Sequence, residues 1–265
     1  MEGFQPKKRY GQNFLTDRGT LRKIVASAGL EPGDTVLEIG PGRGDMTTAI
    51  AEKCKVVAVE IDKDLIPHLK EKYKNTPNVT IVHGDILEAD FSKLIPEKSK
   101  VIANIPYYIS TPIIFKILEN KKYFTTAVMT VQKELADRIV AGHGNKEYGV
   151  LTVMVQLHAD VVVTQHLPAA AFKPAPEVDS SVIKLTIHQK PKYGELDFPH
   201  FEKIVRTGFQ QRRKMLRGTL QQLGYTKEEL EKVLNNCGIK TEARPEEVSI
   251  AGLAELARKL KNLKR

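Results

Sequence analysis

Short apolar runs rich in β-branched residues alternate with segments of helical length over the first 165 residues of this chain. The runs that we expect to form strands are residues 35–39, 55–60, 79–82, 100–104, 126–131 and 160–164. Helical patterns lie between them, at about residues 17–28, 45–53, 63–74, 112–119, 132–141 and 148–157. Such alternation is typical of a parallel sheet with helices on both faces. The sequence therefore predicts an α/β fold with a mostly parallel sheet.

A different pattern begins after residue 179. Residues 180–188 alternate apolar and polar side chains, and we expect them to form a half-buried strand that pairs antiparallel with the preceding strand at one edge of the sheet. Residues 189–199 have the composition of a linker. Helical periodicity follows at about residues 200–210, 212–223, 226–236 and 249–263. We therefore expect two domains, with the sheet in residues 1–190 and a small all-helical domain in residues 191–265.

The positive charge of the chain is concentrated at its two ends. The net charge is +9, of which residues 201–265 contribute +7 and residues 1–23 contribute +4, so the remainder carries −2. Basic ends around a near-neutral middle indicate a polyanionic partner such as nucleic acid, although a solvated basic surface has the same composition. The candidate phosphate contacts are Lys7, Lys8, Arg9, Arg212, Arg213, Lys214 and Arg217. The last four are expected at the start of a helix, where cations oppose the helix dipole unless phosphate faces them.

The sequence does not indicate a membrane protein, a secreted protein or a metal-binding protein. No apolar run reaches the ~18 residues that span a bilayer, and the N-terminus lacks the apolar core of a secretory signal. The two cysteines, Cys54 and Cys237, are far apart and have no metal-type spacing. We expect a cytoplasmic protein with reduced thiols, no bound metal and no membrane partner.

A glycine-rich turn, Glu38-Ile39-Gly40-Pro41-Gly42-Arg43-Gly44-Asp45, follows the first predicted strand and opens a helix. Glycines at such a turn let the backbone approach a ligand closely. A dinucleotide fingerprint needs glycine at the position of Asp45, and Pro41 removes an N–H group that a pyrophosphate would use. The Gly-Lys-Ser/Thr of a phosphate-binding loop does not follow. The turn, with Gly40 and Gly42 as contacts, therefore suits a ligand without phosphate, such as an adenosyl amino acid.

Acidic residues follow the next two predicted strands. Glu60, beside Ile61, ends the strand at 55–60, where a carboxylate can accept both ribose hydroxyls of an adenosine. Asp85 follows the strand at 79–82 and can accept an adenine amine while Ile86 packs on the ring. Alone, the glycine-rich turn could be a tight turn and the aspartate a cap. Their occurrence together at successive strand ends predicts an S-adenosylmethionine site.

The strand at residues 100–104 ends in Asn104-Ile105-Pro106-Tyr107. An amide, a proline and an aromatic ring at a strand end can hold a flat ring that carries an amine, because the ring stacks and two acceptors take the hydrogens. The adenine N6 lone pair is delocalised, so such a site must position the amine and needs no general base. We predict that the side-chain oxygen of Asn104 and the backbone carbonyl of Ile105 or Pro106 accept the two N6 hydrogens.

Several segments resemble, in the same order, the motifs of the ribosomal RNA adenine N6-dimethyltransferases. They are residues 11–15, 38–44, 84–85, 104–111 and 172–180. Residues 209–214 and 244–249 resemble the small-subunit branch of this family, and the resemblance covers nearly the whole chain. It implies a class I methyltransferase with a Rossmann-like, mostly parallel sheet, an antiparallel edge strand and a small C-terminal all-helical domain. Residues 1–190 would form the methyltransferase domain and residues 191–265 would bind RNA.

The resemblance also implies roles for residues around the slot at residues 104–107 that would hold the target adenine. Phe172 would stack on the target base opposite Tyr107, although packing in the core beside a proline-rich turn is its alternative role. Tyr108 is assigned to the structure of the protein. The catalytic set is then Asn104, Pro106, Tyr107 and Phe172.

The N-terminal segment of residues 12–15 would form a lid over the cofactor, with Asn13 and Leu15 at its methionine end. The complete cofactor set is Gln12, Asn13, Leu15, Gly40, Gly42, Glu60, Ile61, Asp85, Ile86 and Asn104. S-adenosylhomocysteine would be the product of each transfer.

The resemblance implies dimethylation of two adjacent adenosines in the 3′-terminal hairpin loop of small-subunit RNA, by a monomer acting on the immature subunit. Two alternatives stay open. Ile105 replaces the leucine that is usual in the small-subunit branch, and isoleucine is frequent in large-subunit enzymes of the macrolide-resistance type. A non-catalytic RNA-binding assembly factor is the second alternative, and the intact segment 104–107 argues against it.

Overall fold

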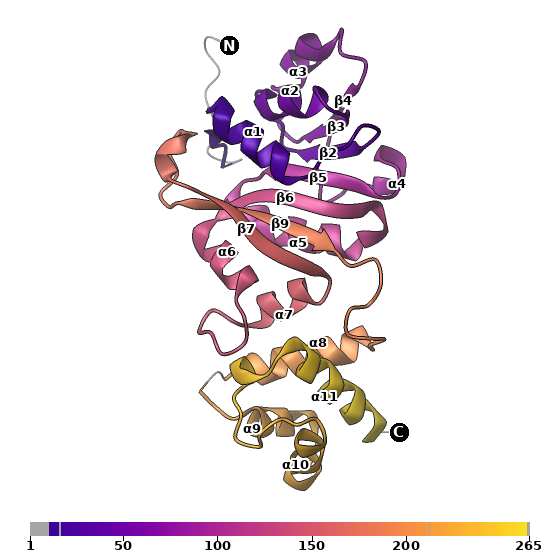
Figure 1. The fold of residues 1–265 in the computed structure, drawn as a ribbon, viewed down its shortest axis with the longest axis vertical. Helices are drawn as coiled ribbons and strands as arrows, with labels where there is room; N and C mark the ends of the chain where they lie inside the picture. Colours follow the sequence, from indigo (N-terminus) through magenta and orange to yellow (C-terminus); the bar gives the residue numbers. More distant parts are fainter. Residues whose placement is uncertain (1–10, 16, 212, 264–265) are drawn as a thin grey trace. The chain divides into compact units, whose positions relative to one another are not determined.

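The computed structural model describes residues 11–15, 17–211 and 213–263. The chain divides into two compact units, unit 1 with residues 1–136 and 159–189, and unit 2 with residues 137–158 and 190–265 (Figure 1). The sequence pattern assigns residues 137–158 to the first domain, but here they belong to unit 2. The hydroxyl of Tyr148 donates to the carbonyl of Val248 at 3.1 Å, and Gly144 N–H donates to the carbonyl of Glu246 at 2.7 Å. Within the described residues, no helix combines the length and the apolar character needed to cross a membrane.

Unit 1 is built on a seven-stranded sheet in the order β4-β3-β2-β5-β6-β9-β7. Every neighbouring pair from β4 to β6 is parallel, whereas β9 runs antiparallel to both β6 and β7. Helices lie on both faces of the sheet (Figure 1), which confirms the predicted fold class. The strands are β2 (Thr35–Ile39), β3 (Lys55–Glu60), β4 (Val79–His83), β5 (Ser99–Asn104), β6 (Phe124–Gln132), β7 (Ala159–Leu167) and β9 (Ser180–Ile187).

β9 pairs antiparallel with β7, the strand that precedes it, at one edge of the sheet, which confirms the predicted pairing, and β9 itself lies one position inside that edge. Val182, Ile183 and Leu185 of β9 are fully buried, as in a strand that is covered on both sides. By contrast, β7 alternates between exposed and half-buried residues, and its Val162 is 55% exposed. The edge position therefore belongs to β7.

Unit 1 also contains the helices that cover the sheet. Leu21, Ile24 and Val25 of α1 and Met46 and Ile50 of α2 pack in one apolar cluster against β2, β3 and β5. A second cluster joins α3 to β4. The helices are α1 (Arg18–Ser27), α2 (Asp45–Ala51), α3 (Ile66–Tyr73), α4 (Phe91–Leu94) and α5 (Ser110–Glu119), with the 3-10 turns η2 (Tyr107–Ile109), η3 (Lys121–Tyr123) and η4 (Ala169–Ala171); α6 (Lys133–Val140) begins in unit 1 and ends in unit 2.

The parallel register brings the ends of several strands to one edge of the sheet. Ile39 of β2 lies opposite Val59 of β3 and Ala103 of β5, and Glu60 lies opposite His83 of β4. The segments that follow these strands therefore meet where ligands usually bind in an open α/β sheet.

Two short strands complete unit 1. β1 (Phe14–Leu15) pairs antiparallel with β8 (Phe172–Lys173), although 157 residues separate Leu15 from Phe172 in the sequence. Neither strand is predicted by the sequence pattern, because two residues show no periodicity. This pairing attaches the N-terminal segment to the connection between β7 and β9.

Unit 2 is helical. Its core includes Phe201, Ile204, Leu220, Leu234 and Leu256, all fully buried. Its elements are α7 (Val150–Gln156), α8 (Phe198–Phe209), α9 (Leu216–Leu220), η5 (Gln221–Leu223), α10 (Lys227–Asn236), η6 (Pro245–Glu247) and α11 (Ile250–Leu263).

The helix predicted over residues 212–223 begins only at Leu216. Met215 has an extended backbone, and the N–H group of Leu216 donates to the carbonyl of Ala243 at 2.8 Å. Arg213 and Lys214 therefore lie in the turn that precedes α9, which corrects their expected position at a helix start.

Candidate active site

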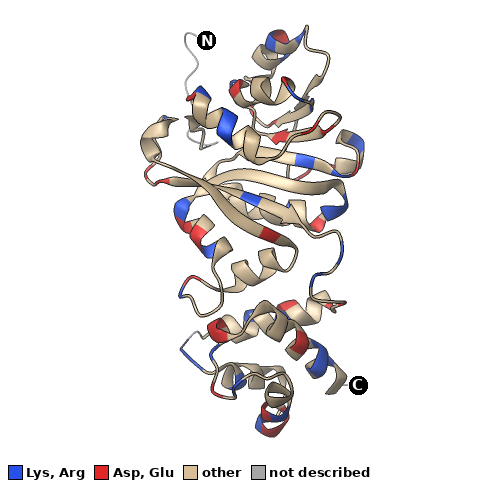
Figure 2. Ribbon diagram, viewed as in Figure 1, with Lys and Arg blue, Asp and Glu red and all other residues tan. Residues whose placement is uncertain are grey.

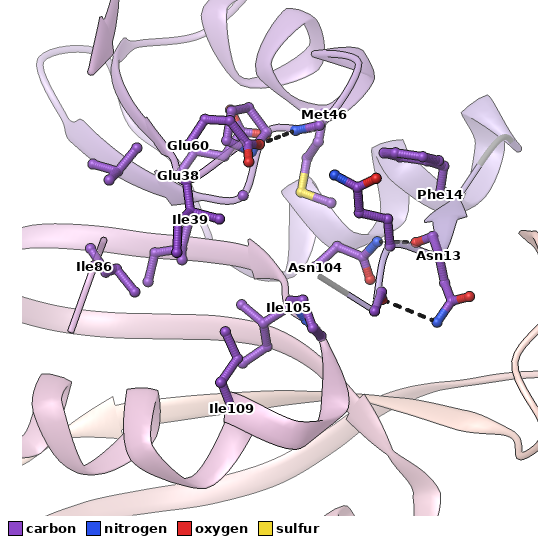
Figure 3. A pocket seen from close by; sticks show the side chains of 18 of the residues that line it. Asn13, Phe14, Glu38, Ile39, Met46, Glu60, Ile86, Asn104, Ile105 and Ile109 are labelled. Atoms are coloured by element: carbon purple, nitrogen blue, oxygen red, sulfur yellow. Dashed lines mark hydrogen bonds between the residues drawn. The ribbon is translucent and has the colours of Figure 1, made fainter. Parts of the chain in front are cut away.

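A cavity opens at the carboxyl ends of β2, β3 and β5, and Figure 3 shows its lining. Every residue that the sequence singles out for cofactor or base contact borders this one cavity. These residues come from six separate segments of the chain, residues 12–15, 40–42, 60–61, 85–86 and 104–107 together with Phe172. The positions of the atoms of these residues show which of the predicted contacts are possible.

The glycine-rich turn leaves no room for side chains at two positions. Gly42 has φ +57°, and a Cβ atom there would lie 2.7 Å from the ring of Phe14. Gly44 has φ +78°, and a Cβ atom there would lie 2.6 Å from the hydroxyl of Tyr73. Both requirements, a left-handed backbone and close approach, are met only by glycine.

Helix α3 holds the same turn from behind, a contact that sequence reasoning missed. Lys72 Nζ donates to the carbonyl of Arg43 at 2.9 Å, and the Tyr73 hydroxyl donates to the carbonyl of Gly44. The Tyr73 hydroxyl also lies 2.8 Å from Thr48 Oγ1. The sequence gives no signal for this contact, because α3 is far from the turn along the chain.

Glu60 is buried and fixed by backbone donors. Its Oε2 accepts the N–H group of Gly42 at 3.0 Å, and its Oε1 accepts the N–H group of Asp62 at 2.9 Å. Burial raises the pKa of Glu60, and these hydrogen bonds oppose the rise. A carboxylate oxygen can accept more than one hydrogen bond, so both oxygens still offer acceptor positions to ribose hydroxyls. The geometry fits the predicted cofactor contact.

Asp85 and Ile86 lie beyond β4 in the same cavity. Asp85 is exposed, and its Oδ1 accepts the N–H group of Leu87 at 2.9 Å. Ile86 is buried and borders the cavity with its side chain (Figure 3). One carboxylate oxygen and an apolar surface are therefore available for an adenine ring.

Glu38, the first residue of the glycine-rich segment, lines the cavity from within the core. It is 2% exposed, and its Oε2 has no hydrogen-bond partner among the described residues. Burial, with the nearby charge of Glu60, raises the pKa of Glu38 to about 8. Near neutral pH this side chain is therefore mainly a protonated acid. Sequence reasoning did not select it, because a glutamate at the end of a buried strand has no motif of its own.

Residues 11–15 cross the cavity as a strap, and we use this name for them below. Gln12 Nε2 donates to Asp62 Oδ2 at 3.1 Å. The ring of Phe14 lies 4.9 Å from the guanidinium of Arg43, within reach of a cation–π contact. Leu15 is 4% exposed and joins the apolar core. The strap thus contacts both the glycine-rich turn and the end of β3.

The strap also orients Asn104. Its Nδ2 donates to the backbone carbonyl of Asn13 at 3.0 Å, a contact drawn in Figure 3. The amide nitrogen is thereby engaged, and Oδ1 is the atom left to accept a hydrogen from a ligand. The carbonyl of Pro106 already accepts two hydrogen bonds, from the N–H group of Ile109 at 3.2 Å and from the hydroxyl of Ser110 at 3.4 Å. This leaves the carbonyl of Ile105 as the better candidate for a second acceptor.

Two aromatic residues were predicted to enclose the target base, and they differ in environment. Tyr107 is half-buried, and its hydroxyl lies 2.6 Å from Oγ of the fully buried Ser180. Burial raises the pKa of the Tyr107 hydroxyl. Phe172 lines the cavity but is only 2% exposed and packs in the core cluster that contains Leu15. Its alternative role, core packing, is therefore realised here, and stacking on a base would require its ring to be uncovered.

The predicted phosphate contacts are placed only in part. Lys7, Lys8, Arg9 and Arg212 lie outside the described residues. Arg213 and Lys214 are exposed in the connection between α8 and α9, much of which is blue in Figure 2. Arg217 forms an ion pair with Glu231 of α10, so it also has a structural contact within unit 2.

Comparison with known proteins shows to which family this chain belongs. A profile of the family described as ribosomal RNA adenine dimethylase matches residues 3–262. The chain belongs to this family. The membership confirms the resemblance found in the sequence and makes the protein an S-adenosylmethionine-dependent ribosomal RNA adenine dimethyltransferase.

Individual proteins are similar to this chain over almost its whole length. Ribosomal RNA small subunit methyltransferase A of Geobacter metallireducens is 41% identical over 97% of this chain and 96% of its own. A dimethyladenosine transferase from Plasmodium falciparum superposes with a TM-score of 0.83 at 27% identity, covering 94% of this chain and 98% of that one. The 23S rRNA methyltransferase ErmE gives a TM-score of 0.77 at 29% identity, covering 94% and 100%.

Proposed function

We propose that this dimethylase transfers methyl groups from S-adenosylmethionine to N6 of two adjacent adenosines in the 3′-terminal hairpin loop of small-subunit ribosomal RNA. The product would be N6,N6-dimethyladenosine, formed by a monomer on the immature subunit in the cytoplasm. The observation that carries the proposal is Asn104, whose amide is held by the strap at the mouth of the glycine-rich turn. The 41% identity to a small-subunit enzyme supports the choice of target.

In this proposal the protein positions the amine and needs no general base. The cofactor supplies an activated methyl group on its sulfonium. Asn104 Oδ1 and the carbonyl of Ile105 accept the two N6 hydrogens, and these bonds strengthen as the nitrogen becomes positive in the transition state. The proton leaves the product ammonium readily. For the second transfer only one N–H group remains, so one of the two acceptors must tolerate a methyl group beside it.

The ring of Tyr107 provides the surface on which the adenine stacks. Base–aromatic stacking contributes about 1–3 kcal/mol, which helps to offset the loss of stacking when the base leaves its loop. The contact between Tyr107 and Ser180 holds this ring in place. Phe172, which borders the same cavity, would supply the opposite wall if its ring became uncovered.

The proposal is tested by transfer of labelled methyl groups from S-adenosylmethionine to isolated small and large subunits that lack these methyl groups, followed by mapping of the modified nucleotides. We expect label only in the small subunit, on two adjacent adenosines. Label on the large subunit would favour the macrolide-resistance alternative. Absence of label although S-adenosylmethionine binds would favour the non-catalytic assembly factor.

A further inference from the structure

Tyr108 is the most exposed of the large hydrophobic residues in the described part of the chain, at 63%. It follows Tyr107 in the 3-10 turn η2 and lines the same cavity. In a 3-10 turn, consecutive side chains point about 120° apart. The hydroxyl of Tyr107 contacts Ser180, whereas Tyr108 lies at the rim of the cavity with most of its surface in water.

Gly11 of the strap lies beside the ring of Tyr108. A Cβ atom at Gly11 would lie 3.4 Å from Cε1 and 3.5 Å from Cδ1 of this ring, so the backbone of the strap passes close to it. Gly11 has φ +55°, which is easily adopted only by glycine. The ring therefore lies between the strap and the solvent at the rim of the cavity, with most of its surface exposed. The sequence assigns Tyr108 to the structure of the protein, but a residue with 63% of its surface exposed buries little area in the core.

We propose that Tyr108 stacks on a nucleobase adjacent to the target adenosine while that adenosine occupies the slot. The inference rests on the proposed function, because it needs an RNA loop as the substrate. When one base leaves its stack, its neighbours lose a stacking partner. An aromatic ring at the rim, next in sequence to the ring beneath the target, can replace that partner. Stacking of this kind accepts any base, so it would add affinity for an unpaired loop without reading its sequence.

The chain contains no tryptophan, which allows a direct measurement. In a Tyr108→Trp variant the indole is the only tryptophan, and stacking on a base quenches its fluorescence. We expect quenching when unmethylated small subunits are added and no comparable quenching in a Val162→Trp variant. Val162 is the matched control because it is 55% exposed and does not border the cavity. An unquenched Tyr108→Trp variant that binds the subunits would overturn the inference.

Steady-state kinetics provide a second, independent readout. Tyr108→Ala should raise KM for unmethylated small subunits by about 5- to 150-fold, while Tyr108→Phe should keep KM near the wild-type value. The dissociation constant for S-adenosylmethionine should be unchanged in both variants. An unchanged KM in Tyr108→Ala, or an equal loss of cofactor affinity, would overturn the inference while leaving the proposed function intact. The proposed function itself fails only if the wild-type protein does not methylate small subunits.

Discussion

At the scale of single residues, the cavity contains carboxyl groups in opposite environments. Asp85 is exposed, whereas Glu38 is buried with one oxygen that has no partner among the described residues. Burying a carboxylate without partners is costly, and the neutral acid is favoured instead. Glu38 should therefore influence how stability depends on pH.

The direction of this dependence follows from the raised pKa. Between the ordinary value of 4.5 and about 8, folded Glu38 keeps a proton that the unfolded chain has lost. The contribution of Glu38 to stability is thus complete below pH 4.5 and is lost as the pH rises through this window. We expect the wild-type free energy of unfolding to fall relative to that of Glu38→Gln between pH 5 and pH 8, by a few kcal/mol at about 1.4 kcal/mol per pKa unit. Urea denaturation at several pH values measures the difference, and parallel profiles would contradict it.

Ser180 is a positioning residue for Tyr107 in this account. Its Oγ lies 2.6 Å from the Tyr107 hydroxyl, and a lost hydrogen bond of this kind costs about 1 kcal/mol. Ser180→Ala should therefore lower kcat several-fold without changing cofactor affinity, and Ser180→Thr should restore much of the loss. In a Tyr107→Phe background, where the hydroxyl is already absent, Ser180→Ala should have little further effect. An equal loss in both backgrounds would show that Ser180 acts elsewhere.

At the scale of elements, the strap and the glycine-rich turn form one unit of the site. The ring of Phe14 occupies the space that a side chain at Gly42 would need. Gly42→Ala should displace the strap and weaken S-adenosylmethionine binding at least ~10-fold, because the new methyl group meets the ring and the positive φ disfavours alanine.

The control for Gly42→Ala is Gly33→Ala. Gly33 also has a positive φ, +94°, but nothing lies within 4 Å of a Cβ atom there. Gly33→Ala should lower the stability of the protein through backbone strain and leave the affinity for S-adenosylmethionine unchanged. Isothermal titration with S-adenosylmethionine measures both variants. Equal affinities of Gly42→Ala and the wild type would contradict the contact, and equal losses in both variants would assign the effect to strain.

The elements also show what sequence can predict. The bounds of β2 and β3 match the predicted strands at 35–39 and 55–60, because each is a short run rich in β-branched residues. The residues around the cavity follow from the same logic, since parallel strands end at one edge. The pairing of β1 with β8 and the insertion of β9 beside β6 are long-range contacts that leave no local pattern. Lys72, Tyr73 and Ser180 were missed for that reason.

At the scale of the whole molecule, exposed positive charge is the property through which the protein would attract the phosphate groups of a ribosomal substrate. Arg213→Ala combined with Lys214→Ala removes two exposed cations from the turn before α9. We expect weaker binding to small subunits and a salt dependence shallower by about 1.5 in the slope of log K against log salt. The affinity for S-adenosylmethionine should not change.

A matched control removes the same charge from two helices of unit 2. Lys203 of α8 and Lys232 of α10 are both exposed. The combined Lys203→Ala and Lys232→Ala variant should bind small subunits nearly as the wild type does. Filter binding across a salt series measures both double variants. An equal loss of affinity for small subunits in the two variants would show that overall charge, and not phosphate binding by this turn, determines the affinity.

The central claim is that the slot at Asn104 positions adenine N6 for methyl transfer. Single-turnover formation of N6,N6-dimethyladenosine, with S-adenosylmethionine and unmethylated small subunits at saturation, tests it most directly. Asn104→Ala should lower this rate by at least ~100-fold, because a transition-state hydrogen bond is lost, while subunit affinity stays nearly unchanged. A rate near that of the wild type, or methyl groups on another atom of adenine, would contradict it.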